Sequence, residues 1–193
     1  MNRILASLLS LLIAALAGCA SLSESECRSG DWGGIGYRDG AAGFQRTILD
    51  SHDKACAKSG VKPNANAWYA GYERGNAAYC TPQRGLDEGI NGASYRGVCP
   101  APLEAAFLER YNVGRQVFQA RQTLANIASD IARIDSELAR SDLKPERRRE
   151  LFSQRNYHRV LHIQASQQVM SMEAWARGTT SALPPPPSLP IGR

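Results

Sequence analysis

The fold of this chain is decided by residues 113–138, which read VGRQVFQARQTLANIASDIARIDSEL. Apolar residues recur in this stretch at alternating steps of four and three, at Val113, Val117, Ala120, Leu124, Ile127, Ile131, Ile134 and Leu138. Such a repeat puts all its members on one side of a helix and is typical of a coiled-coil seam. We therefore expect one long helix with a single continuous apolar face.

A second long helix is expected after a short polar link. Pro145 and Glu146 are typical of a helix start, and a weaker apolar series then runs through Leu151, His158, Leu161, Ala165, Gln168, Met172 and Trp175. A short link between two long helices predicts an antiparallel hairpin, which we place at residues 103–178. His158 and Gln168 weaken the second seam and leave room for a partner helix or for self-association. A hairpin packed on the preceding domain is the alternative.

Residues 27–102 differ in composition, being rich in glycine and aromatic residues. Glycines recur at steps of four and three, at Gly36, Gly40 and Gly43 and again at Gly85, Gly89 and Gly92, while Trp68, Gly71 and Gly75 are spaced three and four. On a helix such residues share one face. Glycine inside a helix costs about 1 kcal/mol relative to alanine, which close approach of another backbone or a ring would offset. The alternative is that these glycines lie in turns.

A helix is also expected over residues 44–59, with Gly60 as its C-cap. Together these features predict an all-α fold, in which a small helical domain pinned by disulfides precedes the long hairpin.

Four cysteines of the first domain are candidates for disulfides: Cys27, Cys56, Cys80 and Cys99. Small exported domains often use disulfides to restrict the unfolded chain. Four cysteines can pair in three ways, and we prefer Cys27–Cys56 with Cys80–Cys99. A metal site is the alternative because His52 and Cys56 are four residues apart. No paired CxxC motif accompanies them, so we expect no metal and no cofactor.

Residues 1–18 have the pattern of a secretion signal. Arg3 precedes an apolar run over residues 4–16, which is shorter than the roughly 20 residues of a membrane-spanning helix. The sequence Leu16-Ala17-Gly18-Cys19 then resembles the lipobox of bacterial lipoproteins, in which the cysteine is acylated after cleavage. We expect a lipoprotein anchored through Cys19, with a linker over residues 19–26. An ordinary signal peptide is the alternative. Ala20, in place of an aspartate, favours the outer over the inner membrane, with the protein facing the periplasm.

The formal net charge is +5, and much of the excess lies at the start of the second long helix, at Lys144, Arg147, Arg148 and Arg149. These residues form either a solvated turn and helix surface or a contact for anionic lipid heads or an acidic partner. Nucleic acid is not an expected partner of an exported protein. Residues 179–193 form a proline-rich tail for which we expect no packed structure.

The glycines, cysteines and aromatic residues of the first domain occur in a definite order. They are Cys27, Asp31-Trp32, Gly36-Tyr37-Arg38-Asp39-Gly40, Gly43 and Cys56, then Gly71, Gly75 and Tyr79-Cys80, and finally Gly85, Gly89, Gly92 and Tyr95-Arg96-Gly97-Val98-Cys99-Pro100. This order resembles the DUF2799 family of uncharacterised bacterial lipoproteins over most of residues 27–115. Asn76 departs from the pattern, in which an apolar residue is expected after Gly75. The resemblance implies no activity.

No catalytic motif stands out. The candidates are Asp31, Asp39, His52, Asp53 and Glu73, but His52 and Asp53 are neighbours, which do not face each other on a helix. The GxSxG pattern of a serine nucleophile is absent, and no glycine segment has the lysine of a phosphate loop. Salt bridges and helix caps are the simpler roles for these side chains, so we do not expect an enzyme.

The leading functional hypothesis is an interaction or scaffolding role in the cell envelope, in which the hairpin or an aromatic surface binds another envelope protein. The second is a binding module for a small molecule or a peptidoglycan fragment. Its surface would comprise Trp32, Tyr37, Asp39, Trp68, Tyr72 and Tyr95. A hydrolase built on Asp31, Asp39 or His52 is the least favoured hypothesis.

Overall fold

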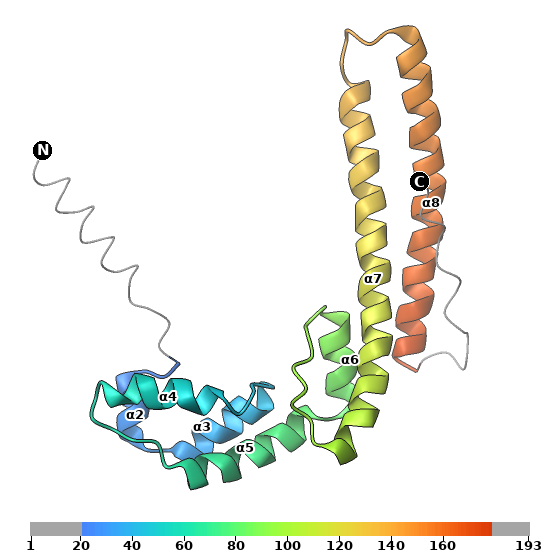
Figure 1. Cartoon of the computed structure of the whole chain (residues 1–193). Helices are drawn as coiled ribbons and strands as arrows, with labels where there is room; N and C mark the ends of the chain where they lie inside the picture. Colours follow the sequence, from blue (N-terminus) through green and yellow to red (C-terminus); the bar gives the residue numbers. More distant parts are fainter. Residues whose placement is uncertain (1–20, 179–193) are drawn as a thin grey trace, which may run out of the picture. The chain divides into compact units, whose positions relative to one another are not determined.

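The computed structural model of the chain describes residues 21–178 (Figure 1). The predicted signal peptide, Cys19 and the proline-rich tail lie outside these residues. Every regular element in residues 21–178 is a helix, which confirms the all-α fold. The helices are α2 (Glu24–Ser29), α3 (Trp32–Ala41), α4 (Ile48–Ala57), α5 (Ala65–Tyr79), α6 (Pro82–Ile90), α7 (Ala101–Leu138) and α8 (Pro145–Ala176). None of these helices is both long and apolar enough to cross a bilayer.

The described chain forms two compact units. The first unit comprises residues 21–80 and 96–103, and the second comprises residues 81–95 and 104–178. Composition alone placed a boundary between residues 102 and 103. The contacts instead group residues 81–95 with the long helices, because the glycines of α6 lie directly against α7.

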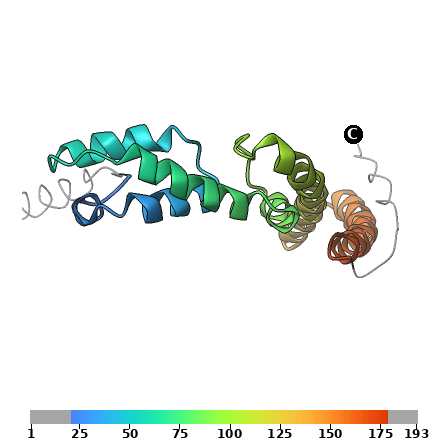
Figure 2. The ribbon, with the colours of Figure 1, turned by 90° about the horizontal axis from the view of Figure 1, so that it is seen from below.

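In the first unit, glycines hold the backbones of α3 and α5 together. A Cβ atom placed on Gly36 would lie less than 3.0 Å from the carbonyl group of Trp68, and one on Gly40 would overlap the backbone of Tyr72. The contact is reciprocal, because a Cβ on Gly71 or Gly75 would overlap the backbone of α3. The expected reason for the glycine face, close approach of another backbone, is therefore confirmed for these four glycines. Figure 2 shows the two helices side by side.

In the second unit, α6 and α7 pack in the same way. A Cβ on Gly85 would overlap Phe107, one on Gly89 would overlap Tyr111, and one on Gly114 would overlap Leu86 of α6. After the first helix of each pair comes a glycine with positive φ, Gly43 or Gly92. Each of these lies against a ring of the second helix, that of Tyr79 for Gly43 and that of Phe118 for Gly92.

The two helix pairs are structural repeats of each other. Tyr72 donates a hydrogen bond from its hydroxyl to the Phe44 carbonyl at 2.6 Å, and Tyr111 donates one to the Ala93 carbonyl at 2.7 Å. Corresponding residues differ by 49 in the first helix (85 − 36, 89 − 40, 92 − 43) and by 39 in the second (111 − 72, 114 − 75, 118 − 79). The smaller second offset means that ten residues fewer separate the helices of the second pair. Its connecting segment contains no counterpart of α4.

Two disulfides complete the first unit. Cys27 is bonded to Cys56 and Cys80 to Cys99, with Cα–Cα distances of 5.4 and 5.5 Å, which confirms the preferred pairing. Helix α4 starts at Ile48 rather than at residue 44, because Ile48, Leu49 and Asp50 donate to carbonyls three residues earlier. These bonds make residues 45–47 a turn.

The segment predicted as a linker, residues 19–26, is folded over its described part. Leu22 is buried in the core of the first unit. Ser23 caps α2, since its hydroxyl accepts from the Glu26 N–H while Glu26 accepts from the Ser23 N–H. Hydrogen bonds from Ser23 hold the pKa of the Glu26 carboxyl below its usual value, with Arg38 adding to the effect.

Helices α7 and α8 form an antiparallel hairpin (Figures 1 and 2). At about 1.5 Å per residue, the 38 residues of α7 span about 57 Å. Every residue of the α7 seam is buried or half-buried, and so is every residue of the α8 series. Val169 and Ala176 are also buried, although the predicted series omitted them.

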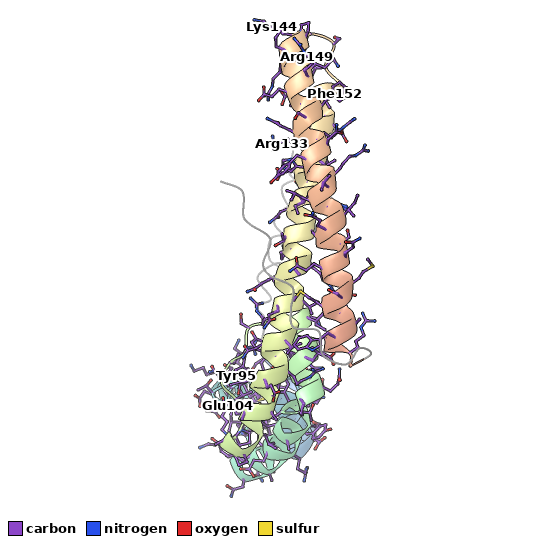
Figure 3. The ribbon with its side chains drawn as sticks, turned by 90° about the vertical axis from the view of Figure 1, so that its right-hand side faces the viewer. Tyr95, Glu104, Arg133, Lys144, Arg149 and Phe152 are labelled. Carbon is purple, nitrogen blue, oxygen red and sulfur yellow. A yellow bond between two sulfur atoms is a disulfide. The ribbon has the colours of Figure 1, made fainter. Side chains whose placement is uncertain are left out.

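The arginines of the basic cluster at the start of α8 form ion pairs and hydrogen bonds within the hairpin. Arg147 pairs with Glu137 at 2.9 Å and also contacts Glu150, while Arg149 pairs with Glu146. Arg148 donates to the carbonyls of Leu138 and Arg140, which close the end of α7. The hydrogen bond from Arg147 lowers the pKa of Glu137. Figure 3 shows Lys144, Arg149 and Phe152 near the loop that joins the two helices.

The glycine packing gives a matched pair of substitutions in one helix. Gly36→Ala should lower the free energy of unfolding by about 2 kcal/mol, because the added methyl group forces α3 and α5 apart. Gly33→Ala should leave it unchanged or raise it by up to about 1 kcal/mol, because its Cβ would meet only the Ala67 carbonyl at 3.8 Å. Urea unfolding followed by circular dichroism measures both, and equal effects would contradict the packing.

Candidate functional site

A buried polar cluster in the first unit joins four segments of the chain. Asp39 on α3 accepts a hydrogen bond at Oδ2 from Trp68 Nε1 at 2.8 Å and lies 2.9 Å from His52 Nε2. His52 Nδ1 in turn lies 2.8 Å from the hydroxyl of Ser21. Asp39, His52 and Trp68 are 8%, 2% and 0% exposed.

The cluster brings together the residue types of a hydrolase triad, serine, histidine and aspartate. A neutral His52 that donates from Nε2 to Asp39 can accept the Ser21 hydroxyl at Nδ1, so each of its ring nitrogens has a partner. Neither Ser21 nor His52 lines either cavity described below. We therefore interpret the cluster as a network that fixes α3, α4 and α5 and the start of the described chain. Sequence reasoning selected Asp39 and His52 but missed Ser21, which is 31 residues from His52.

The second helix pair, which repeats the first, shows that the helix packing does not require the polar cluster. In the second unit, Glu88 corresponds to Asp39 and Phe107 to Trp68, while His52 has no counterpart because α4 is absent. Glu88 pairs with Arg84 at 2.9 Å. The same backbone packing is thus achieved without an Asp–Trp hydrogen bond, so the cluster is a feature of the first unit alone.

The predicted aromatic surface is largely a core. Trp32, Trp68 and Tyr72 are at most 5% exposed, so their faces cannot stack on a ligand from solvent. Tyr37 is 45% exposed, and Tyr95 belongs to the second unit. Tyr95 donates a hydrogen bond to Glu104 there (Figure 3). Trp32, Trp68 and Tyr72 were wrongly predicted as surface residues, because the same aromatic residue types occur at helix interfaces and at binding surfaces.

Two other selected residues, Asp31 and Cys56, have structural partners. Asp31 caps α3 by accepting from the Gly34 N–H at 2.9 Å. Cys56, which the alternative metal site would have used, is in the expected disulfide. Residues 21–178 contain no group of three histidine, cysteine or acidic side chains arranged to hold a metal ion.

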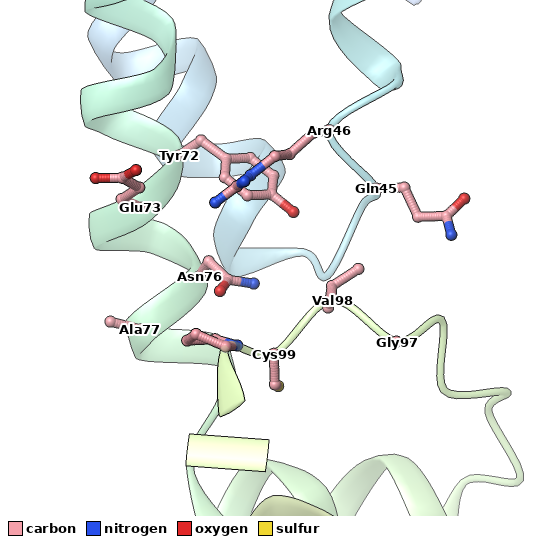
Figure 4. A pocket seen from close by; sticks show the side chains of 10 residues that line it. Gln45, Arg46, Tyr72, Glu73, Asn76, Ala77, Gly97, Val98 and Cys99 are labelled. Carbon is pink, nitrogen blue, oxygen red and sulfur yellow. The ribbon is translucent and has the colours of Figure 1, made fainter. Parts of the chain in front are cut away.

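A cavity of about 670 Å³ lies in the first unit, between α5 and two connecting segments (Figure 4). We call it the Asn76 cavity; it is lined by Gln45, Arg46, Tyr72, Glu73, Asn76, Ala77, Gly97, Val98, Cys99 and Pro100. Burial raises the pKa of Tyr72, an effect that nearby Arg46 opposes. Sequence reasoning missed this cavity, although Asn76 had stood out as a departure from the family pattern.

Helix α8 carries a second group of apolar residues that face solvent. Phe152, Tyr157, Val160, Ile163 and Met170 are between 41% and 62% exposed. Beside them lies a second cavity, of about 540 Å³, lined by Ala128, Ile131, Arg159, His162 and Ile163. Sequence reasoning missed this feature as well, because the exposed apolar residues lie outside the seam repeat of α8.

Substitutions in the polar cluster should show that its bonds are coupled. Asp39→Ala should lower the free energy of unfolding by about 2–4 kcal/mol, because it leaves the buried Trp68 N–H and His52 without their acceptor. Trp68→Phe removes one donor and part of a fully buried ring system, and should cost about 2–3 kcal/mol. The double variant should lose less free energy of unfolding than the sum of the losses in the two single variants. Urea unfolding of the four proteins measures the coupling, and strict additivity would contradict the network.

No curated protein and no solved structure matches the chain. Residues 31–116 match one family model, described as a protein of unknown function, DUF2799. The match runs from the N-cap of α3 into α7, and so includes both glycine-packed helix pairs. These residues of the chain therefore belong to the DUF2799 family.

Proposed function

We propose that this protein is a lipid-anchored interaction protein of the cell envelope, whose α8 binds an acidic amphipathic helix of another protein. The observation that carries the proposal is the apolar outer face of α8. Its members are Phe152, Val160, Ile163 and Met170, which we call the outer face.

The outer face is separate from the face that closes the hairpin. Phe152, Ile163 and Met170 are spaced 11 and 7 residues apart, which places them on one side of a helix. The inward side is already formed by Leu151 and Met172, which are at most 5% exposed. A long helix with two apolar faces is suited to contact a third helix in addition to its hairpin partner.

A groove next to the outer face supports a helical partner. The cavity of about 540 Å³ is bounded by Ala128 and Ile131 of α7 and by Ile163 of α8. The small side chain of Ala128 permits close approach, and an apolar groove between two helices is the usual seat for an amphipathic helix.

The charges along α8 support an acidic partner. Between Glu150 and Glu173 the helix contains arginines and histidines but no aspartate or glutamate. Arg159 is exposed at the edge of the second cavity. A second copy of the chain would bring like charges together, whereas acidic residues flanking an apolar stripe would complement them.

The proposed location in the envelope is supported by the secretion-like residues 1–18 and the lipobox-like sequence ending at Cys19. The two disulfides agree with an oxidising compartment, since such bonds are rare in proteins of the cytosol.

A photo-crosslinking amino acid at Met170 should capture one partner protein in intact envelopes, and the crosslinked segment should be a helix with acidic residues beside an apolar stripe. Ile163→Glu should then reduce capture about tenfold more than Ile163→Lys, because only glutamate repels an acidic partner. Ile163 is 58% exposed, so both variants should fold. Mass spectrometry of the crosslinked peptides provides the measurement.

The same crosslinker at Gln122, an exposed polar residue of α7, serves as the control and should capture nothing specific. Capture of a second copy of this chain, or of lipid alone, would refute the acidic helical partner. Equal losses with Ile163→Glu and Ile163→Lys would refute the role of charge.

A further inference from the structure

We propose that the Asn76 cavity binds the carboxylate of a small organic acid whose remaining part is apolar. This site lies in the first unit and is independent of the partner proposed for α8.

The floor of the cavity contains a buried hydrogen-bond donor without an acceptor. Asn76 is 5% exposed, and its Nδ2 has no hydrogen-bond partner in the described structure. Buried polar groups are nearly always hydrogen-bonded, and an unsatisfied donor is costly. Figure 4 shows the Asn76 amide nitrogen pointing from α5 toward Val98. A bound oxygen atom at this place would satisfy the amide.

A positively charged side chain lines the same cavity as this donor. The Arg46 guanidinium lies over the Tyr72 ring, 5.7 Å from its centroid, and makes no ion pair with the carboxylates of residues 21–178. Guanidinium groups bind carboxylates through two parallel hydrogen bonds. The donor and the cation together therefore suit an oxygen-bearing anion.

The other lining residues favour a singly charged anion with an apolar part. Glu73 also lines the cavity, and in Figure 4 its carboxylate points away from Arg46. Its negative charge opposes a ligand with two charges, such as phosphate. Val98, Pro100 and Ala77 offer apolar walls. A volume of about 670 Å³ is typical of small-molecule sites and far exceeds the space that one ion needs.

The walls of the cavity are fixed before any ligand binds. The disulfide Cys80–Cys99 ties one connecting segment to the end of α5. Gln45 donates from Nε2 to the Arg96 carbonyl at 3.2 Å, which joins the two connecting segments. The Tyr72 hydroxyl donates a hydrogen bond to the carbonyl of Phe44. A preformed site loses little conformational entropy on binding.

The repeat indicates that the helix packing does not require Asn76. Arg115 stands at the corresponding position of α7 (76 + 39), where its guanidinium lies 5.0 Å from the Phe118 ring centroid. The tyrosine–carbonyl hydrogen bond is nevertheless kept in both units. An unsatisfied buried amide in the first unit alone therefore points to a ligand rather than to the fold.

The test is an NMR titration of the full mature chain with phenylacetate, its neutral amide phenylacetamide, and inorganic phosphate. Phenylacetate should shift the side-chain amide signals of Asn76 at concentrations up to about 10 mM, the range expected for a ligand of roughly ten non-hydrogen atoms. Phenylacetamide and phosphate should shift them far less.

Two variants separate a binding role from a structural one. In Asn76→Leu, binding is followed by the backbone amide signals of Gly97 and Val98, which line the same cavity. This variant should abolish binding without lowering Tm, because it removes an unsatisfied donor. Arg46→Gln, at an exposed position, should weaken binding about tenfold or more. Arg74→Gln, on an exposed part of the same α5 outside the cavity, is the control and should leave binding unchanged.

Three results would overturn the proposal. They are no shift of the Asn76 amide by phenylacetate, shifts of equal size with phosphate or phenylacetamide, and an Arg46→Gln variant that binds as the parent does. A lowered Tm in Asn76→Leu with binding retained would likewise assign Asn76 to the fold.

Discussion

Direct contact between helix backbones is the interaction on which both units depend. Helices usually meet through side chains, with axes 8–10 Å apart, whereas Gly36, Gly40 and Gly75 leave no room for a side chain between α3 and α5. With the seam itself closed to side chains, the large rings must pack beside it. Trp68 and Tyr72 lie there with centroids 4.9 Å apart. The glycines thus determine where the aromatic core can form.

Comparison of the two glycine-packed helix pairs shows which features accompany the packing in both units and which occur in one unit only. Both pairs keep the positive-φ glycine against a ring and the tyrosine that holds a carbonyl of the following segment. The first unit adds α4, the disulfide Cys27–Cys56 and the Asp39 cluster. In the second unit, α7 instead continues beyond the part that packs on α6, and this extension forms the hairpin with α8. The same packing of two helices therefore occurs beside α4 and a disulfide in the first unit and beside a long hairpin in the second.

Much of this fold could be predicted from the sequence because its signals are local. The four–three repeat from Val113 to Leu138 identified the buried side of α7, and the order of the cysteines agreed with pairing of near neighbours. The candidate sites could be predicted only in part, because they depend on segments that meet in three dimensions. Ser21 reaches His52 only once α4 has folded, and the exposure of Asn76 and Ile163 depends on which neighbours cover them. Composition also could not separate buried rings from rings that bind ligands.

The early start of the folded chain has a consequence for geometry at the bilayer. Leu22 is already part of the core, and only three peptide steps separate it from Cys19. Even when fully extended, these steps span about 10 Å. In a protein acylated at Cys19, the first unit would be held almost against the lipid headgroups. A tether of this length would let the first unit rotate at the bilayer surface but would not let it move far from that surface.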